Sequence, residues 1–577
     1  MTAARASASP GTDAASAARA VRVPRFVRAL RPCCVAVGVL VFSLALVAAL
    51  SGVAVAADGG AAGAAAGAGT HDAAAATTPL DDANGTTQVI VRFTPVEDPD
   101  ALGEPDGNGS AAVADLREHA AAEQAAFEAF ADSRAGVTVE REFWLANAML
   151  VTVDADEVTA ASLLSVANVT DVHRNVAVEP LRASARSSGA PGPRTPPSQN
   201  HRPQTPRLQI DAEPSGSYTA GLRLVGAPTA WERFDTRGAG ATVAVIDTGV
   251  DPGHRDVDLS GWASFDDNGT VVSDDLADAS DPDGHGTHVA GTVAGGDASG
   301  THIGVAPEAD LVGLDAFGEN DTATFAAVIG AMEYATTESD ADVLQLSLGS
   351  SGTFRGFIRP VRNARATGAV VVAAAGNEGA NTSSGPANVY DALAVGAVDE
   401  DRAVAAFSSG QPINASAAFE TYPEEWPERY VVPDVAAPGV GVVSAEAGTR
   451  NGYVRRQGTS MAAPHVSGIA ALAVAATDGR VDDDDLQAAI VDTAVHPTNA
   501  TEPDDRYGHG VVDAPAAVGA AVEATPPEAD STNEGETNGS ADRETGSEDG
   551  APGFGGVAAV VAIVAVAGLT TRRGGRR

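Results

Sequence analysis

Residues 458–468 read GTSMAAPHVSG and lead into an apolar run that continues to residue 476. The run has helical character, so Ser460 is expected in the first turn of a helix, shortly after a glycine. Free backbone N–H groups and the positive end of the helix dipole favour a developing negative charge at such a position. Two interpretations of Ser460 follow: it is a nucleophile whose reaction builds an oxyanion, or it is a simple helix cap.

Two upstream stretches favour the nucleophile. Residues 241–251, ATVAVIDTGVD, form an apolar strand pattern that ends in Asp247, and residues 283–291, DGHGTHVAG, place His285 at the start of another helix-like run. In open α/β sheets, functional groups collect at the carboxyl ends of the strands. An Asp, a His and a Ser supply the orienting anion, the base and the nucleophile of acyl transfer, and their order along this chain is one in which such triads occur.

These three stretches resemble the active-site signatures of the subtilisin-like serine proteases, the subtilases. A fourth stretch, residues 373–379 with the sequence AAAGNEG, resembles the family segment that carries the asparagine of the oxyanion hole. Four matches in the family's order make the resemblance specific. A Ser-based esterase would instead need a G-x-S-x-G motif, which the sequence around Ser460 lacks.

The resemblance implies a serine endopeptidase that hydrolyses peptide bonds in proteins through an acyl-enzyme. Ser460 would attack the scissile carbonyl, His285 would move the proton and Asp247 would orient the histidine. The side-chain amide of Asn377 would bind the oxyanion. Three consecutive residues would line the substrate cleft: Ser347, Leu348 and Gly349. The alternative is a catalytically inactive subtilase-like binding or scaffold protein of the cell surface.

A structural calcium ion is the cofactor that the resemblance suggests, and no organic cofactor is expected. Asp256 falls where subtilases often place a calcium-binding carboxylate, and calcium takes about six to eight oxygen ligands. Residues 296–305, GDASGTHIGV, are shorter than the usual calcium loop of the family, which leaves this site in doubt. The acidic residues of the loop 266–283 have a second interpretation as a hydrated surface.

The composition limits which partners and which classes of protein remain possible. The 577 residues include 77 acidic and 36 basic residues, the formal net charge is −41, and every basic residue is an arginine. This acidity argues against nucleic acid as a partner. Acidic, lysine-free surfaces resemble those of proteins from extreme halophiles, where salt screens the self-repulsion. Among the subtilases, the chain resembles the halolysins. A disordered acidic protein is excluded because 44% of the residues are hydrophobic.

Residues 218–524 are expected to form the catalytic domain, because strand and helix patterns alternate along them. Such alternation predicts an α/β fold with a parallel central sheet and helices on both faces, as in subtilisins. Residues 409–430 are expected to be an additional surface loop. The strands are expected at residues 242–246, 310–314, 342–347, 370–375 and 392–396, and the helices at 285–295, 322–336, 356–367, 460–476 and 483–493.

Residues 88–182 carry the pattern of a smaller domain. The expected order is strand, helix, two strands, helix and strand, which is a ferredoxin-like α+β arrangement, with the last strand at residues 172–178. This domain resembles the propeptide of subtilases, which implies an intramolecular inhibitor; a generic ferredoxin-like domain is the alternative. Residues 183–217 are rich in Pro, Ser, Arg and Gln, and we expect a disordered junction there in which the chain cuts itself.

The N-terminal end of the chain indicates export. Residues 1–57 contain scattered arginines, an apolar run and closing small residues, the layout of a secretory signal peptide. An uncleaved signal anchor is the alternative. Cys33 and Cys34, the only cysteines, lie in this segment, so a mature protein without disulfides is expected. Residues 58–87 are expected to be mainly a linker.

The C-terminal end resembles a sorting signal. Residues 525–551 are acidic and lack apolar periodicity, as in a solvated spacer. Residues 552–577 contain PGF, an apolar run and an arginine cluster, and the run is shorter than the roughly 20 residues of a membrane-spanning helix. This end resembles the PGF-CTERM signal of archaeal surface proteins, which implies cutting and a lipid anchor; a plain membrane anchor is the alternative. The sequence therefore predicts an exported, self-processed serine endopeptidase at the cell surface.

Overall fold

The structure is a computed structural model, and it describes residue 80 and residues 85–102, 109–182, 217–318, 322–498, 500 and 503–525. The predicted signal peptide, linker, processing junction, acidic spacer and sorting segment lie wholly or almost wholly outside these residues. What the sequence predicts for those segments therefore stays a prediction.

The first described domain is a small antiparallel sheet with a long helix packed against one face. Its strands have the order β2-β3-β1-β4. Val89 of β1 lies opposite Val151 of β3, and both side chains pack with Phe127 of α1 in a core of their own. The predicted ferredoxin-like order of elements is confirmed. The elements are β1 (Thr86–Phe93), η2 (Pro99–Ala101), α1 (Gly109–Ser133), β2 (Val137–Phe143), β3 (Ala148–Asp154), α2 (Ala160–Leu164), β4 (Val169–Arg174) and β5 (Ala177–Pro180).

The single closing strand predicted at residues 172–178 is wrong, because β4 stays in the small sheet and β5 leaves it. The two residues between these strands accept hydrogen bonds from the other domain. The Asn175 side chain accepts a hydrogen bond from the Ala326 amide at 3.0 Å, and the Val176 carbonyl accepts one from the Phe325 amide at 2.8 Å. These amides belong to the first turn of helix α6 (Phe325–Thr337), which leaves them without helical partners. The chain therefore turns at this point, and β5 pairs elsewhere.

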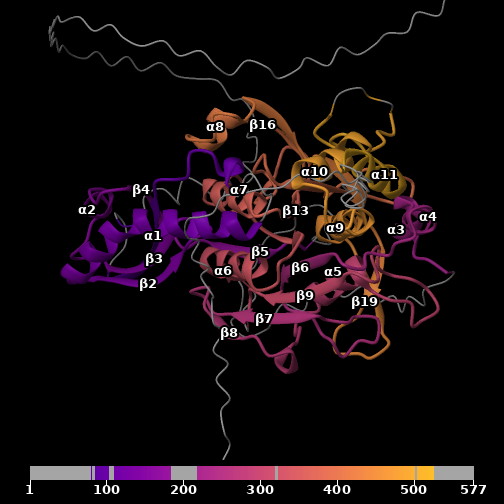
Figure 1. Ribbon diagram of the computed structural model, residues 1–577, viewed down its shortest axis with the longest axis horizontal. Coiled ribbons are helices and arrows are strands. Elements are labelled where there is room, and N and C mark those ends of the chain that lie inside the picture. The colour runs from indigo at the N-terminus through magenta and orange to yellow at the C-terminus, as the bar shows by residue number, and fades with distance from the viewer. Residues whose placement is uncertain are drawn as a thin grey trace, which may run out of the picture. The chain divides into compact units, whose positions relative to one another are not determined.

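An eight-stranded sheet forms the centre of the second domain (Figure 1). Its strands have the order β18-β15-β13-β11-β6-β9-β7-β8, and all neighbours are parallel except β7 and β8. The strands are β6 (Thr242–Asp247), β7 (Gly261–Phe265), β8 (Val271–Ser273), β9 (Asp310–Asp315), β11 (Val343–Leu346), β13 (Val370–Ala374), β15 (Leu393–Val398) and β18 (Val435–Pro438).

Helices cover both faces of this sheet, because its central strands are apolar on both sides. Successive residues of β6 enter two different cores: Val243 and Val245 pack on the side of α5 and α9, whereas Ala244 and Ile246 pack on the side of α6 and α7. The predicted α/β fold is confirmed. The first side carries α3 (Ala220–Val225), α4 (Ala227–Phe234), α5 (His285–Ala294), α9 (Thr459–Ala476), α10 (Asp483–Asp492) and α11 (Ala514–Ala524), and the second carries α6 and α7 (Ile358–Ala366).

The segment predicted as a surface loop at residues 409–430 packs into the core on the α6 and α7 side of the sheet. Phe419 and Trp426 are buried, and their ring centroids lie 5.7 Å apart. The loop prediction is wrong because these two aromatic side chains, spaced by polar residues, join the core on the α6 and α7 side of the sheet. The segment contains β16 (Gln411–Asn414) and α8 (Ala415–Phe419) and leads into β17 (Arg429–Val432). The remaining short elements are η3 (Leu276–Asp278), β10 (Ala323–Thr324), β12 (Leu348–Ser351), η4 (Arg355–Phe357), β14 (Ser384–Gly385), β19 (Val442–Ala445) and β20 (Tyr453–Arg456).

Helix α9 is the central helix of the second domain. Within the described residues it is the one helix that is long and apolar enough to cross a membrane by length and composition. It is also 89% buried inside the protein, packed against α5, α11 and the sheet. Its apolar sequence is therefore accounted for by the core.

Candidate active site

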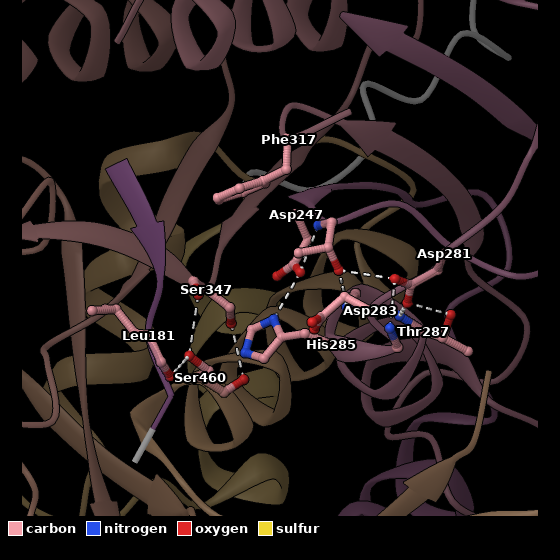
Figure 2. A network of polar contacts seen from close by, with 12 residues as sticks. Leu181, Asp247, Asp281, Asp283, His285, Thr287, Phe317, Ser347 and Ser460 are labelled. Carbon is pink, nitrogen blue, oxygen red and sulfur yellow. Dashed lines mark hydrogen bonds and ion pairs between the residues drawn. The ribbon is translucent and has the colours of Figure 1, made fainter. Parts of the chain in front are cut away.

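The three residues predicted to react lie at the carboxyl edge of the central sheet (Figure 2). Asp247 is the last residue of β6, His285 is the first residue of α5, and Ser460 is the second residue of α9. Gly284, with a φ of 82°, turns the chain into α5, and Gly458, with a φ of 150°, turns it into α9. Glycine adopts such angles without the steric cost that a side chain brings, so sharp entries into both helices are possible.

Asp247 and His285 form a buried pair. His285 Nδ1 lies 2.7 Å from Asp247 Oδ1, and each side chain is 1% exposed. The Thr248 backbone amide donates to the same carboxylate oxygen at 2.7 Å. His285 Nε2 has no hydrogen-bond partner within the described part of the chain, and in the view of Figure 2 the ring lies between Asp247 and Ser460. An imidazole whose Nδ1–H is held by a carboxylate can take up a proton at Nε2.

The carbonyl oxygen of Leu181 lies at the predicted nucleophile. Ser460 Oγ donates to this oxygen at 2.6 Å, and Asn377 Nδ2 donates to it at 2.8 Å. The Leu181 amide donates to the Ser347 carbonyl at 3.1 Å. Acyl transfer needs a nucleophile and preorganised donors around one carbonyl, and both converge here on a peptide carbonyl of the chain itself.

The segment before this carbonyl lies as a strand along the predicted substrate cleft. β5 pairs antiparallel with β12, so that Leu348 lies opposite Pro180 and Gly349 lies opposite Glu179. On its other side β5 pairs with β10. The backbone groups of an extended peptide are satisfied in this way by two neighbouring strands, as in other cases of strand addition. The three predicted cleft residues thus lie along the backbone of a bound peptide segment.

Two donors hold the Asn377 side chain in one orientation. Its Oδ1 accepts hydrogen bonds from the Thr459 amide at 2.9 Å and from the Thr459 hydroxyl at 3.1 Å. Because these donors occupy the amide oxygen, the NH2 group must face the Leu181 carbonyl. A Cβ added at Gly458 would lie 3.4 Å from both Asn377 Nδ2 and the Leu181 oxygen, so glycine at this position keeps the space around the carbonyl open.

Pro464 lies inside α9 and changes the hydrogen bonding of the nucleophile. Proline has no amide hydrogen to donate to the Ser460 carbonyl four residues earlier. Ser347 Oγ donates to that carbonyl instead, at 2.9 Å, and Ser460 Oγ donates to the Ser347 carbonyl at 3.1 Å. The Gln345 side chain donates to Ser347 Oγ at 2.8 Å. Ser347 therefore contacts both the bound chain and the nucleophile, and the proline in the helix is the sequence signal for this second contact.

Asp281 organises the base side of the site, and no sequence pattern singles it out. Its Oδ1 accepts hydrogen bonds from the Thr248 hydroxyl at 3.0 Å and the Gly284 amide at 2.7 Å. Its Oδ2 accepts from the amide and the hydroxyl of Thr287, both at 2.7 Å. Burial raises the pKa of Asp281 to about 6, although the hydrogen bonds from Thr287 and Gly284 lower it. The carboxylate ties the loop after β6 to the first turn of α5, and so holds Asp247 and His285 in register.

Asp256, the predicted calcium ligand, lies apart from these groups. Its Oδ1 accepts the Ala298 amide at 2.6 Å, and its Oδ2 accepts the Tyr453 hydroxyl at 2.5 Å. Calcium needs several further oxygen ligands, whereas both neighbours here are donors. The described residues contain no group of three or more His, Cys, Asp or Glu side chains that could hold a metal ion. The surroundings of Asp256 do not fit a calcium site, and a calcium ion elsewhere stays a prediction.

Known proteins share the part of the chain that carries this site. Residues 238–510 match the Subtilase family. Over 312 residues the chain is 36% identical to alkaline elastase YaB of Bacillus sp. (strain YaB), covering 54% of this chain and 73% of that protein. It is 39% identical over 240 residues to subtilisin DY of Bacillus licheniformis, covering 41% and 77%, respectively. It is 37% identical over 252 residues to subtilisin Savinase of Lederbergia lenta, covering 44% and 82%.

Proposed function

The chain belongs to the subtilase family and is a serine endopeptidase, and we propose that it is made as a zymogen that cuts its own bond between Leu181 and Arg182. The observation that carries this proposal is the Leu181 carbonyl oxygen, which lies 2.6 Å from Ser460 Oγ and 2.8 Å from Asn377 Nδ2. The proposed bond lies at the end of the predicted propeptide, directly before the junction at residues 183–217. The catalytic chain would then begin at Arg182.

The proposed reaction uses the predicted triad. The Ser460 hydroxyl turns from its two carbonyl acceptors toward His285, which takes the proton as Oγ attacks the Leu181 carbonyl carbon. Asp247 stabilises the imidazolium, and the Asn377 amide and the Ser460 backbone N–H bind the oxyanion. The C–N bond breaks, and the histidine gives its proton to the leaving amine. Water then attacks the acyl carbon while the histidine takes its proton, and the serine is regenerated with Leu181 as a free carboxylate.

After this cut the small domain would stay bound as an inhibitor. β5 would still occupy the cleft, and contacts away from the cut bond would hold the domain in place. The Leu145 amide donates to Glu333 Oε1 at 3.0 Å, and Arg141 Nη2 lies 3.3 Å from Glu333 Oε2. Asn363 Nδ2 donates to the Leu145 carbonyl at 2.7 Å. None of these contacts involves the scissile bond, so activity would require release or degradation of the small domain.

Location and salt preference are part of the same proposal and rest on the sequence. The layout of residues 1–57 supports export, and the resemblance of residues 552–577 to a sorting signal supports attachment to the cell surface. The net charge of −41 without any lysine supports a protein that works in high salt. Protein and peptide substrates would reach such an enzyme outside the cell.

The test is the intact mass and N-terminal sequence of the purified full-length protein, beside Ser460→Ala, in high salt. We expect wild type to give a catalytic chain that begins at Arg182, and Ser460→Ala to keep the bond intact. A wild-type N-terminus at another residue, absent from Ser460→Ala, would support Ser460 as the nucleophile but would show that the bond between Leu181 and Arg182 is not the one that is cut. Identical trimming of both proteins would overturn self-processing. No hydrolysis of casein by the trimmed wild type would favour the inactive scaffold instead.

A further inference from the structure

The residue after the proposed scissile bond makes a specific charged contact. Arg182 Nη2 lies 2.6 Å from Asp283 Oδ2. The two side chains are 34% and 31% exposed, so the pair is partly open to solvent rather than in the core. Charge-assisted contacts between a guanidinium and a carboxylate are short and directional. Residues before the bond are held by backbone pairing, whereas the residue after it is held through its side chain.

The position of Asp283 is set by the catalytic loop itself. Asp283 lies between Asp281 and His285, and the next residue, Gly284, has a φ of 82° and donates its amide to Asp281 Oδ1 at 2.7 Å. Figure 2 draws Asp283 beside Asp281 and His285, on the side of the site away from Leu181. A carboxylate two residues before the catalytic base is therefore held where the departing half of a substrate must lie.

The Asp283 carboxylate has capacity for a second donor. Its Oδ1 is buried and has no hydrogen-bond partner within the described residues. Arg182 reaches only Oδ2 here, but a guanidinium offers several N–H donors in a planar fork, so an arginine at this position can also meet Oδ1. One other cation lies nearby: a Cβ added at Gly284 would be 3.2 Å from Arg456 Nη2. That arginine limits the local negative potential but is not bonded to Asp283 Oδ1.

We propose that Asp283 makes the enzyme select peptide bonds that are followed by arginine, so that its preferred substrates carry a Leu–Arg bond. This inference rests on the proposed cleavage after Leu181. Because the pair is about one-third exposed, its contribution is expected to be modest, about fivefold in kcat/KM at low salt. Screening shortens the range of charge interactions to about 3 Å at 1 M salt. The preference for arginine should therefore become smaller as salt is added, but the share that comes from the direct contact with Asp283 should remain.

The test uses peptides added to the processed enzyme. Three fluorogenic peptides carry the sequence of residues 177–181, followed by arginine, alanine or glutamate at the next position. The quantity measured is the ratio of kcat/KM for the arginine peptide to that for the alanine peptide. We expect a ratio of about five for wild type and about one for Asp283→Asn. Asp283→Arg should favour the glutamate peptide.

A matched control separates selection from a general structural effect. Asp274→Asn removes the same charge from the same acidic loop at an exposed position, and we expect it to keep the wild-type ratio. Equal losses on all peptides in Asp283→Asn, with the ratio unchanged, would overturn the proposal, and so would a wild-type ratio of one. The ratio is measured on added peptides, so it does not depend on where the zymogen is cut. A mature chain that begins at Arg182 together with a flat ratio would overturn the role of Asp283 alone.

Discussion

The small domain contacts the catalytic domain in two regions with different chemistry. In the cleft, β5 and Leu181 are held by backbone pairing. The second region, here called the docking face, contains ionisable side chains. Arg92 and His173 of the small domain and Glu333 of the catalytic domain are buried there, and Arg141 and Arg359 are half-buried. Backbone pairing does not titrate, whereas buried ionisable groups do. Cleavage should therefore depend on the few groups around one carbonyl, and release should depend on pH through the docking face.

The largest effect is expected in the cleft, from loss of the oxyanion donor. Asn377→Ala removes the side-chain amide that donates to the Leu181 carbonyl at 2.8 Å. Loss of one such donor typically slows turnover by about 10²–10³-fold. We expect cleavage of the zymogen and of an added peptide to slow by this factor, measured as single-turnover processing by intact mass and as kcat.

The matched control for Asn377→Ala is a residue that contacts the small domain away from the cleft. Asn363 also donates through its side-chain amide: its Nδ2 is buried and donates to the Leu145 carbonyl at 2.7 Å, away from the scissile bond. Asn363→Ala should leave the rate of cleavage within about twofold and weaken the docking of the small domain, because a buried acceptor loses its donor. Equal slowing of cleavage by both substitutions would break the division between the two regions.

The next effect concerns the serine that replaces a helical hydrogen bond. Ser347→Ala leaves the buried Ser460 carbonyl without a donor, because Pro464 has no amide hydrogen. An unsatisfied buried acceptor costs about 1–3 kcal/mol, and part of this strain falls on the nucleophile. We expect kcat to fall about tenfold with KM little changed. Ser444→Ala removes an equally buried hydroxyl that has no partner within the described residues, and it should be neutral. A wild-type kcat in Ser347→Ala would contradict this prediction, because it would show that the first turn of α9 positions Ser460 without the Ser347 hydroxyl.

The same division explains which features can be predicted from the sequence. The strand before Asp247 and the helix from Ser460 are predicted because each is a long apolar run that ends at a glycine turn or begins shortly after one. The separation of β5 from β4 cannot be predicted, because it depends on the amides of Ala326 and Phe325 in another domain. Asp281 is missed for a related reason: an acidic loop in an acidic protein gives no sign that one carboxylate is buried.

On the docking face, Glu333 should weaken the bound state as the pH rises. Burial raises the pKa of Glu333 to about 7, although the Leu145 amide and Arg141 lower it. The pKa of Glu333 in the bound state lies above the ordinary value of 4.5. The contribution of Glu333 to the stability of the complex with the small domain is therefore complete below pH 4.5 and is lost as the pH rises through 7. Glu333→Gln should slow release of the processed small domain by about three- to tenfold at pH 8 and have little effect at pH 4.5. Gel filtration of the processed complex at a series of pH values measures this; faster release at pH 8 would contradict it.

His173 should act in the opposite direction on the same face, with the smallest effect. Its ring lies edge-on to Phe325 and Phe354, with centroids 5.5 and 5.0 Å away. Burial and then the Arg92 charge lower the pKa of His173 to about 4; Arg355 also lowers it, whereas the Arg174 carbonyl and Asp171 raise it. The contribution of His173 to the stability of the complex with the small domain is therefore complete above the ordinary pKa of 6.5 and is lost as the pH falls through 4.

His173→Phe keeps an aromatic ring but removes this titration, so release below pH 6 should become slower than in wild type, by about twofold to threefold. Together with the opposite trend from Glu333, wild type should retain its small domain best between about pH 4.5 and 6.5. The double variant Glu333→Gln, His173→Phe should lose most of this pH dependence. If it keeps the wild-type profile, the dependence comes from the cleft, and the assignment of pH sensitivity to the docking face is wrong.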